Sequence, residues 1–224
     1  MTLADALVNV IDDDISMLKA IGRLLESEDY SVELFTGARE FLARAPHTGP
    51  SCVILDLNMP GLNGLELQEA LAERGRAEQV IFITGGASVP TCAQAMKAGA
   101  VDYLPKPFRD EDLLSAVKRA LERSSEQWLQ RSQRKEVRDR LATLTPREFD
   151  VLKCVIAGRL NKHIASQLGT TEGTIKVHRG RVMEKMGARS VAELVILAQR
   201  QGSHRRRRML LRSNIHARSE RLSL

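Results

Sequence analysis

The first half of this 224-residue chain alternates short apolar runs with amphipathic stretches. The runs, four or five residues long, occupy residues 7–11, 31–35, 52–55, 80–83 and 101–104. The intervals place apolar residues at helical spacing, namely Ile15, Leu18, Ile21 and Leu25, then Leu65, Leu67, Ala70 and Leu71, and finally Leu113, Leu114, Val117, Ala120 and Leu121. Strands that alternate with helices predict an α/β fold, a doubly wound five-stranded parallel sheet with helices on both faces.

Polar side chains follow these runs at the points where the predicted strands end. Asp12 and Asp13 follow the first run, and Asp56 follows the third. Thr84 follows the fourth run, and Lys106 lies just past the fifth. The carboxyl ends of parallel strands share one edge of the sheet, where ligand crevices form. We therefore expect these five side chains to meet in one pocket.

Carboxylates that are brought together repel one another, and a hard divalent cation relieves that repulsion. Oxygen ligands without a nearby Cys or His favour Mg²⁺, or Mn²⁺, over zinc. In such a pocket Asp56 is expected to accept a phosphoryl group as a nucleophile, while the metal ion and Lys106 neutralise the phosphoryl oxygens. The Thr84 hydroxyl would donate a further hydrogen bond, and Gly85 and Gly86 would let the backbone approach an anion closely.

Composition favours a nucleic-acid partner and disfavours several other classes. Residues 1–123 hold 12 basic and 19 acidic residues, a net charge of −7, whereas residues 124–224 hold 22 and 9, a net charge of +13. A strongly basic half favours nucleic-acid binding over a merely solvated surface. Cys52, Cys92 and Cys154 lack metal-site spacing and are expected to be small buried residues.

We expect a cytoplasmic protein that has no membrane partner. The first seven residues have neither the positive region nor the long apolar stretch of a signal peptide. No run approaches the roughly 18 apolar residues that a membrane span requires.

Caps and turns divide the second half into four expected helices. The starts lie at Thr145, Asn161, Thr171 and Ser190, and the ends lie at Gly158, Gly169 and Gly187. Thr145 and Glu148 have capping-box spacing, with Pro146 at the first helical position. Two short helices joined by a glycine turn, the second rich in Lys, Arg and His, favour a helix-turn-helix DNA-binding domain.

The third of these helices has one apolar and one polar side. Ile175, Val182 and Met186 are expected to face the core. An exposed Val177 beside Lys176 suits contact with a thymine methyl group, although an ordinary amphipathic surface helix is the alternative. His178 and Arg179 lie nearer the core and suit phosphate contact or packing. The predicted DNA-binding residues are Thr174, Lys176, Val177, His178, Arg179, Gly180 and Arg181.

Four motifs of the first half, I-D-D-D, L-D-L-N-M-P-G, F-I-T-G and L-P-K-P-F, resemble two-component receiver domains in order and separation. The resemblance covers roughly residues 6–123 and implies the strand order 2-1-3-4-5. It implies that Asp56 is the phosphoacceptor. Asp13 and Asp56 would ligate Mg²⁺ directly together with the backbone carbonyl of Asn58, and Asp12 would act through water. The alternative, in which residues 12–14 only cap the first helix, leaves Asp56 and Lys106 unexplained, although Asp14 alone suits a cap.

The same resemblance implies a switch pair, Thr84 and Tyr103. On phosphorylation the Thr84 hydroxyl would move toward the phosphoryl group, and the Tyr103 ring would turn into the space it leaves. In relatives the fourth helix and the fifth strand form a dimer surface, which here includes Val89, Cys92 and Met96. Each of these three residues could equally belong to the core.

In the second half, T-P-R-E, A-G-R-L-N-K-H-I-A, L-G-T-T-E-G-T-I-K-V-H-R and V-M-E-K-M-G resemble the LuxR-type helix-turn-helix. Residues 6–202 together are similar to a FixJ/NarL-class response regulator. That similarity implies a transcriptional regulator, not an enzyme, with a sensor histidine kinase, double-stranded DNA and a second copy of itself as partners. Lys176 and Val177 match base-reading positions, whereas Gly180 departs from the longer polar residue often found there.

These inferences divide the chain into four parts. A receiver domain is expected at 1–123, a linker at 124–143, a LuxR-type DNA-binding domain at 144–202 and a basic tail at 203–224. The linker either continues the last receiver helix or forms a flexible connector. The tail holds seven arginines. It is expected to be disordered, and its arginines could also add non-specific phosphate contacts.

Two rival functions share parts of this pattern. A metal-dependent phosphohydrolase with an aspartyl nucleophile usually has a second acid two residues after it, where this chain has Asn58. A constitutive DNA-binding protein with a vestigial receiver would not need the complete set of acids, threonine and lysine. Both rivals are therefore less favoured than a phosphorylation-switched transcription factor.

Overall fold

The computed structural model describes residues 6–86 and 88–198, so the predicted basic tail lies outside the described residues. The chain forms two compact units that divide after Gln130. The first unit contains β1 (Leu7–Ile11), α1 (Ile15–Ser27), β2 (Ser31–Phe35), α2 (Ala38–Ala43), β3 (Ser51–Asp56), α3 (Gly64–Glu73), β4 (Gln79–Thr84), α4 (Val89–Lys97), β5 (Asp102–Pro105) and most of α5 (Asp110–Ala142).

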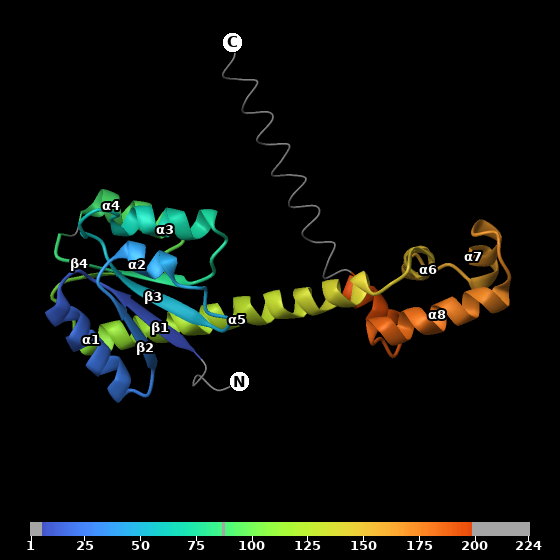
Figure 1. Cartoon of the computed structure of the whole chain (residues 1–224), viewed down its shortest axis with the longest axis horizontal. Coiled ribbons are helices and arrows are strands. Elements are labelled where there is room, and N and C mark those ends of the chain that lie inside the picture. Colours follow the sequence, from blue (N-terminus) through green and yellow to red (C-terminus); the bar gives the residue numbers. More distant parts are fainter. Residues whose placement is uncertain (1–5, 87, 199–224) are drawn as a thin grey trace, which may run out of the picture. The chain divides into compact units, whose positions relative to one another are not determined.

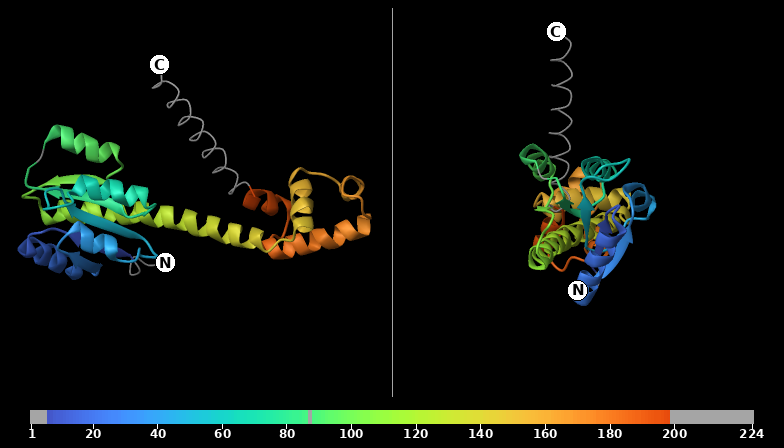
Figure 2. Two further views of the ribbon diagram at one scale, coloured as in Figure 1. Left: turned by 45° about the horizontal axis from the view of Figure 1, so that its top comes forward. Right: turned by 90° about the vertical axis from the view of Figure 1, so that its left-hand side faces the viewer.

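The five strands form one parallel sheet in the order β2-β1-β3-β4-β5, which confirms the expected fold class and strand order. Helices cover both faces (Figure 1), and the end-on view of Figure 2 shows helices on either side of the sheet. Alternate strand residues point to opposite faces. Val10 and Ile54 pack with α1 and α5, whereas Val53 and Leu55 pack with α2, α3 and α4.

The helical stripes predicted from the sequence are buried or half-buried, with one exception. Leu18, Ile21 and Leu25 of α1 are buried, but Ile15 is 57% exposed, contrary to the prediction. Ile15 is the first residue of α1, and it lies at the carboxyl edge of the sheet, beyond the surface against which the stripe packs. Of the three cysteines, Cys52 and Cys154 are buried as predicted, whereas Cys92 on α4 is only half-buried.

Helix α5 continues through the residues expected to form a linker and ends at Ala142. Within the first unit, its extension is bonded to the amino-terminal edge of the sheet. The Ser124 hydroxyl accepts a hydrogen bond of 2.9 Å from the Ser51 amide, and the Trp128 indole donates to the Thr48 carbonyl. The first unit therefore extends beyond the point at which the sequence motifs stop.

The second unit contains the end of α5, then α6 (Pro146–Ile156), α7 (Asn161–Gln167), α8 (Glu172–Met186) and a further helical segment over residues 191–198. The capping box of Thr145 and Glu148 is present, and Thr171 caps α8 as predicted. The core holds Val137 of α5 together with Val151, Leu152, Val155, Ile164, Ile175, Val182, Met186 and Leu194. Among the described residues no helix is long and apolar enough to cross a bilayer.

Candidate functional site

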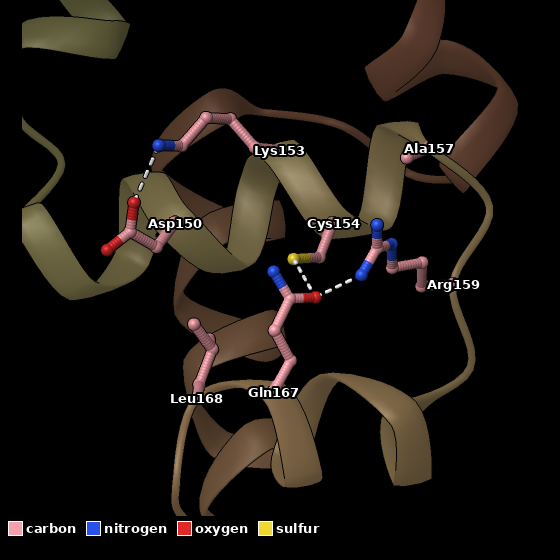
Figure 3. Close-up of a pocket in the computed structure, with 7 residues that line it drawn as sticks. All are labelled: Asp150, Lys153, Cys154, Ala157, Arg159, Gln167 and Leu168. Carbon is pink, nitrogen blue, oxygen red and sulfur yellow. Dashed lines mark hydrogen bonds and ion pairs between the residues drawn. The ribbon is translucent and has the colours of Figure 1, made fainter.

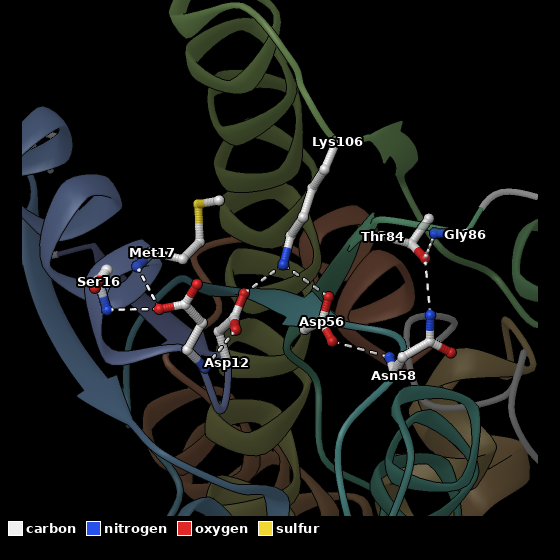
Figure 4. Close-up of polar contacts among 9 residues, drawn as sticks. Asp12, Ser16, Met17, Asp56, Asn58, Thr84, Gly86 and Lys106 are labelled. Atoms are coloured by element: carbon white, nitrogen blue, oxygen red, sulfur yellow. Dashed lines mark hydrogen bonds and ion pairs between the residues drawn. The ribbon is translucent and has the colours of Figure 1, made fainter.

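The carboxyl edge of the sheet brings the predicted pocket residues together (Figure 4). Asp12 follows β1, Asp56 ends β3, and both are almost fully buried, at 1% and 4% exposure. The Lys106 ammonium donates hydrogen bonds of 2.7 Å to Asp12 Oδ2 and 2.9 Å to Asp56 Oδ1. One cation thus bridges acids from two strands, as the strand-end pattern predicted.

The electrostatics of this pocket leave its acids incompletely neutralised. Burial raises the pKa of Asp12, and the hydrogen bonds from Lys106 and from the Asp14 amide only partly oppose that effect. Burial alone would lower the pKa of Lys106, but the hydrogen bonds to Asp12 and Asp56 outweigh it, so the pKa of Lys106 lies above its usual value. Two buried carboxylates share one ammonium, which leaves an excess of negative charge.

A third acid completes a group of oxygen donors that fits a divalent cation. Carboxylate oxygens of Asp12, Asp13 and Asp56 lie within 4.8 Å of one another, and Asp13 is exposed to solvent. An all-oxygen set with excess negative charge is the donor chemistry that Mg²⁺ or Mn²⁺ prefers. Asp14 is different, because its carboxylate caps α1 by accepting from the Ser16 and Met17 amides.

The loop after Asp56 is held by backbone contacts. The Asn58 amide donates a 2.9 Å hydrogen bond to Asp56 Oδ2, which fixes the second carboxylate oxygen. Gly64, the first residue of α3, packs directly on the backbone of Asp56 and Leu57. A Cβ at Gly64 would lie 2.7 Å from the Asp56 carbonyl oxygen, so a larger residue would displace the end of β3.

Thr84 and Tyr103 lie on neighbouring strands beside this pocket. The Thr84 hydroxyl oxygen is buried and accepts hydrogen bonds from the Gly86 amide at 3.2 Å and from the Asn58 side-chain amide at 3.4 Å. The contact from Asn58 was not predicted, because it depends on how the two loops meet. Tyr103 is half-buried, and its ring centroid lies 6.3 Å from that of Phe82. Burial raises the pKa of the Tyr103 phenol.

Helix α8 presents the predicted polar side to solvent. Ile175, Val182 and Met186 are fully buried, whereas Val177 is 54% exposed. The exposed residues around it are Gly173, Thr174, Lys176, Gly180 and Arg181. An exposed valine among basic and small residues on a solvated helix face is a surface suited to the edge of a DNA groove.

Two predicted DNA-binding residues lie nearer the core. His178 and Arg179 are half-buried. Arg179 Nη1 donates a 3.0 Å hydrogen bond to the Asn161 side chain at the start of α7, a contact that sequence reasoning missed. His178 Nδ1 is buried without a hydrogen-bond partner among the described residues. Packing is therefore part of the role of both side chains, as the sequence interpretation allowed.

A pocket of about 330 Å³ lies between α6 and α7 (Figure 3). Its polar groups pair with one another. Lys153 forms a 2.7 Å ion pair with Asp150, and Gln167 Oε1 accepts from Arg159 and from Cys154. We assign no function to this pocket, because its polar side chains satisfy one another.

Comparisons with known proteins agree with this geometry. The family model described as response regulator receiver domain matches residues 8–118, and the model described as bacterial regulatory proteins, luxR family, matches residues 142–198. Nodulation protein W from Bradyrhizobium diazoefficiens is 42% identical over 197 residues, which cover 88% of this chain and 87% of that protein. Transcriptional regulatory protein FixJ from Azorhizobium caulinodans is 44% identical over 191 residues, 85% of this chain and 90% of that protein.

Solved structures show the same architecture. The low-resolution structure of response regulator StyR matches with a TM-score of 0.81 and 40% identity, over 87% of this chain and 98% of that chain. Full-length FixJ from B. japonicum matches with a TM-score of 0.51 and 37% identity, over 88% of this chain and 97% of that chain.

A receiver domain joined to a LuxR-family DNA-binding domain defines a response regulator. This chain belongs to the FixJ-like response regulators and is a phosphorylation-dependent transcription regulator, as the motifs predicted.

Proposed function

We propose that Asp56 accepts a phosphoryl group from a sensor histidine kinase. In this transfer the P–N bond to the kinase histidine breaks as a P–O bond to the Asp56 carboxylate forms, which yields an acyl phosphate. The supporting observation is the position of Asp56, at the carboxyl edge of the sheet and hydrogen-bonded to both Lys106 and the Asn58 amide. We propose a receiver at 1–123, although its contacts continue along α5 through Trp128.

A bound Mg²⁺ or Mn²⁺ would be held by Asp13, Asp56 and the backbone carbonyl of Asn58, with Asp12 acting through water. The close carboxylate oxygens and their excess negative charge support this ligand set. When bound, the cation neutralises charge on the transferred phosphoryl group.

Lys106, Thr84 and Tyr103 would register the phosphorylated state. Lys106 would exchange its bond with Asp56 for one with a phosphoryl oxygen. The Thr84 hydroxyl would turn from the Asn58 and Gly86 amides to donate to the phosphoryl group. The Tyr103 ring, which lies on the neighbouring strand, would then turn into the space left by Thr84.

Phosphorylation would promote a homodimer through the surface of α4 and β5. Val89 is 85% exposed and Met96 is 43% exposed, and both lie on α4. Exposed apolar residues on one helix suit an interface better than a solvated surface. A dimer would present two α8 helices to paired half-sites on double-stranded DNA.

In each copy, α8 would enter the major groove. Lys176 and Val177 would contact base edges, and Thr174 and Arg181 would contact the adjacent backbone. Gly180 would allow close approach, since it carries no side chain. His178 and Arg179 would pack against α7 and contact phosphates from the inner edge of the helix.

A small phosphodonor tests this proposal. The chain is incubated with the donor and Mg²⁺, and the intact mass and the phosphate release are followed in wild type and in Asp56→Asn. We expect one stable phosphate per chain, which is lost in Asp56→Asn. Rapid turnover of many phosphates would instead support a phosphohydrolase, and an unlabelled wild-type chain would support a vestigial receiver. Asn58 argues against the hydrolase, since an amide cannot act as a general acid.

A further inference from the structure

The carboxyl-terminal end of α8 is bonded to the last turns of α5. The final carbonyls of a helix have no partner within that helix. Arg140 of α5 donates a 2.8 Å hydrogen bond from Nη1 to the Met186 carbonyl at this end, while its Nη2 forms a 2.6 Å ion pair with Glu136. A cation at a helix carboxyl terminus also interacts favourably with the helix dipole. Both amino groups of the Arg140 guanidinium are therefore engaged.

The residue after Met186 is adapted to this contact. Gly187 ends α8 with φ +63°, a conformation that favours glycine. A Cβ at Gly187 would also lie 2.5 Å from Arg140 Nη1. The turn favours glycine here, and a side chain at this position would also push the Arg140 guanidinium away from the Met186 carbonyl.

Other contacts tie the end of α8 to the residue that follows α5 and to α6. The Lys185 ammonium donates to the Thr143 carbonyl at 3.1 Å and to Glu148 at 2.7 Å. Val137, one turn before Arg140, is buried in the core of the second unit. At the opposite end of α8, Thr171 caps the helix, and in its middle Arg179 bonds Asn161. Arg140 therefore completes the attachment of α8 at its far end.

We infer that Arg140 is a positioning residue for DNA recognition, which sets the orientation of α8 through the Met186 carbonyl. This inference rests on the proposed role of α8 in base contact. Without the guanidinium, the carboxyl-terminal end of α8 is less constrained. The helix then adopts a wider range of orientations in the groove, and Lys176 and Val177 contact the bases less precisely. Phosphate contacts tolerate this variation in helix orientation better than base contacts do, because base contacts require a fixed geometry. Specific binding should therefore weaken more than non-specific binding.

The test compares Arg140→Met with Arg138→Met in the full chain. Arg138 is exposed on the same helix, so its replacement removes the same charge. The probes are the duplex that the phosphodonor-treated wild type enriches most from a random-sequence pool and a scrambled duplex of equal length. Affinities are measured over a range of salt concentrations, at a temperature where circular dichroism shows each variant to be folded.

We expect the affinity for the selected duplex, divided by that for the scrambled duplex, to fall about tenfold in Arg140→Met, roughly the discrimination that one good base contact supplies. In Arg138→Met this ratio should stay near that of wild type. The salt slope should be the same in both variants. An unchanged ratio in Arg140→Met overturns the inference. So does a slope shallower by about 0.9 than that of Arg138→Met, because that difference means direct contact with a phosphate.

Arg140→Lys decides the question if Arg140→Met does not fold. An ammonium keeps the charge but lacks the two amino groups that join Met186 and Glu136. We therefore expect Arg140→Lys to prefer the selected duplex over the scrambled duplex, but less strongly than wild type does. A wild-type ratio in a folded Arg140→Lys overturns the inference. If the wild-type chain enriches no sequence, the proposed function and this inference both fail. If wild type prefers the selected duplex and Arg140→Met prefers it equally, only the inference fails.

Discussion

At the scale of single residues, the pocket holds more negative than positive charge. Lys106 bonds both Asp12 and Asp56, and Asp13 stands beside them with its carboxylate in solvent. Burial holds the pKa of Asp12 above its usual value, so the folded chain bears a penalty for keeping this acid ionised. A divalent cation would remove that penalty, and its binding would therefore stabilise the fold.

Asp13→Asn should abolish stabilisation by Mg²⁺ without unfolding the chain, because Asp13 is exposed. At Mg²⁺ about 100 times its Kd, the wild type should gain about 2.7 kcal/mol of unfolding free energy. Urea unfolding with and without Mg²⁺, followed through the single tryptophan, Trp128, measures this gain. Asp14→Asn is the matched control, since asparagine caps a helix as well as aspartate does. Equal gains in both variants would remove Asp13 from the metal site.

Glu148 of the second unit is a buried acid that is paired with Lys185. The Lys185 ammonium and the Thr145 amide lower the pKa of Glu148 from 4.5 to about 2. A lowered pKa in the folded state stabilises the fold above the unfolded pKa, and this contribution is lost as the pH falls from about 4.5 to about 2.

Glu148→Gln should therefore destabilise the second unit most at neutral pH. The difference from wild type should shrink below pH 4.5 and vanish near pH 2. Unfolding followed by circular dichroism across this range measures it. Asp150→Asn, which breaks an exposed ion pair on the same helix, should change stability little at any pH. A Glu148→Gln effect that does not vary with pH would contradict the assignment.

Residues at strand ends could be predicted, whereas contacts between loops could not. Asp12, Asp56, Thr84 and Lys106 follow apolar runs, and the parallel topology alone brings such residues together. The bonds from Asn58 to Thr84 and from Arg179 to Asn161 depend on side-chain directions that no periodicity encodes.

At the scale of elements, α5 belongs to both units. Its first part packs under the sheet, and Val137 near its end is buried in the core of the DNA-binding unit. The sequence did not decide whether residues 124–143 form a helix or a flexible connector. They are polar, contain few helix breakers and have too few apolar positions to show a helical pattern. The strand runs were easier to predict, since both faces of a parallel sheet are buried and each run is continuous.

Val137→Ala should destabilise the second unit by about 2 kcal/mol, because it removes buried methyl groups and leaves a cavity. Hydrogen exchange should show the loss of protection in α6 and α8 but not in the sheet. Leu129→Ala, at a half-exposed position on the same helix, should have little effect. Protection lost equally from the sheet would show that Val137 does not belong to the second core alone.

At the scale of the whole molecule, an acidic receiver is joined to a basic DNA-binding half. Two copies joined through their receivers would place two basic halves on one duplex. Val89 of α4 is the most exposed large apolar residue of the described chain, which makes it the sharpest probe of that dimer.

Val89→Asp should weaken dimerisation of the phosphorylated chain at least about tenfold, because like charges would meet across a symmetric interface. An acid is tolerated at the first residue of a helix, so folding should be unaffected. Sedimentation of the phosphodonor-treated protein measures the dimer. Leu34→Asp, on the strand at the opposite edge of the sheet, is the control. A normal dimer in Val89→Asp would place the interface elsewhere.

The affinity of one chain for its selected duplex, measured before and after phosphodonor treatment, tests the switch most directly. We predict an increase of at least about tenfold in wild type, within the usual range of coupling between two sites, and none in Asp56→Asn. The same affinity before and after treatment, or an increase that persists in Asp56→Asn, would contradict the claim that phosphate on Asp56 controls DNA binding.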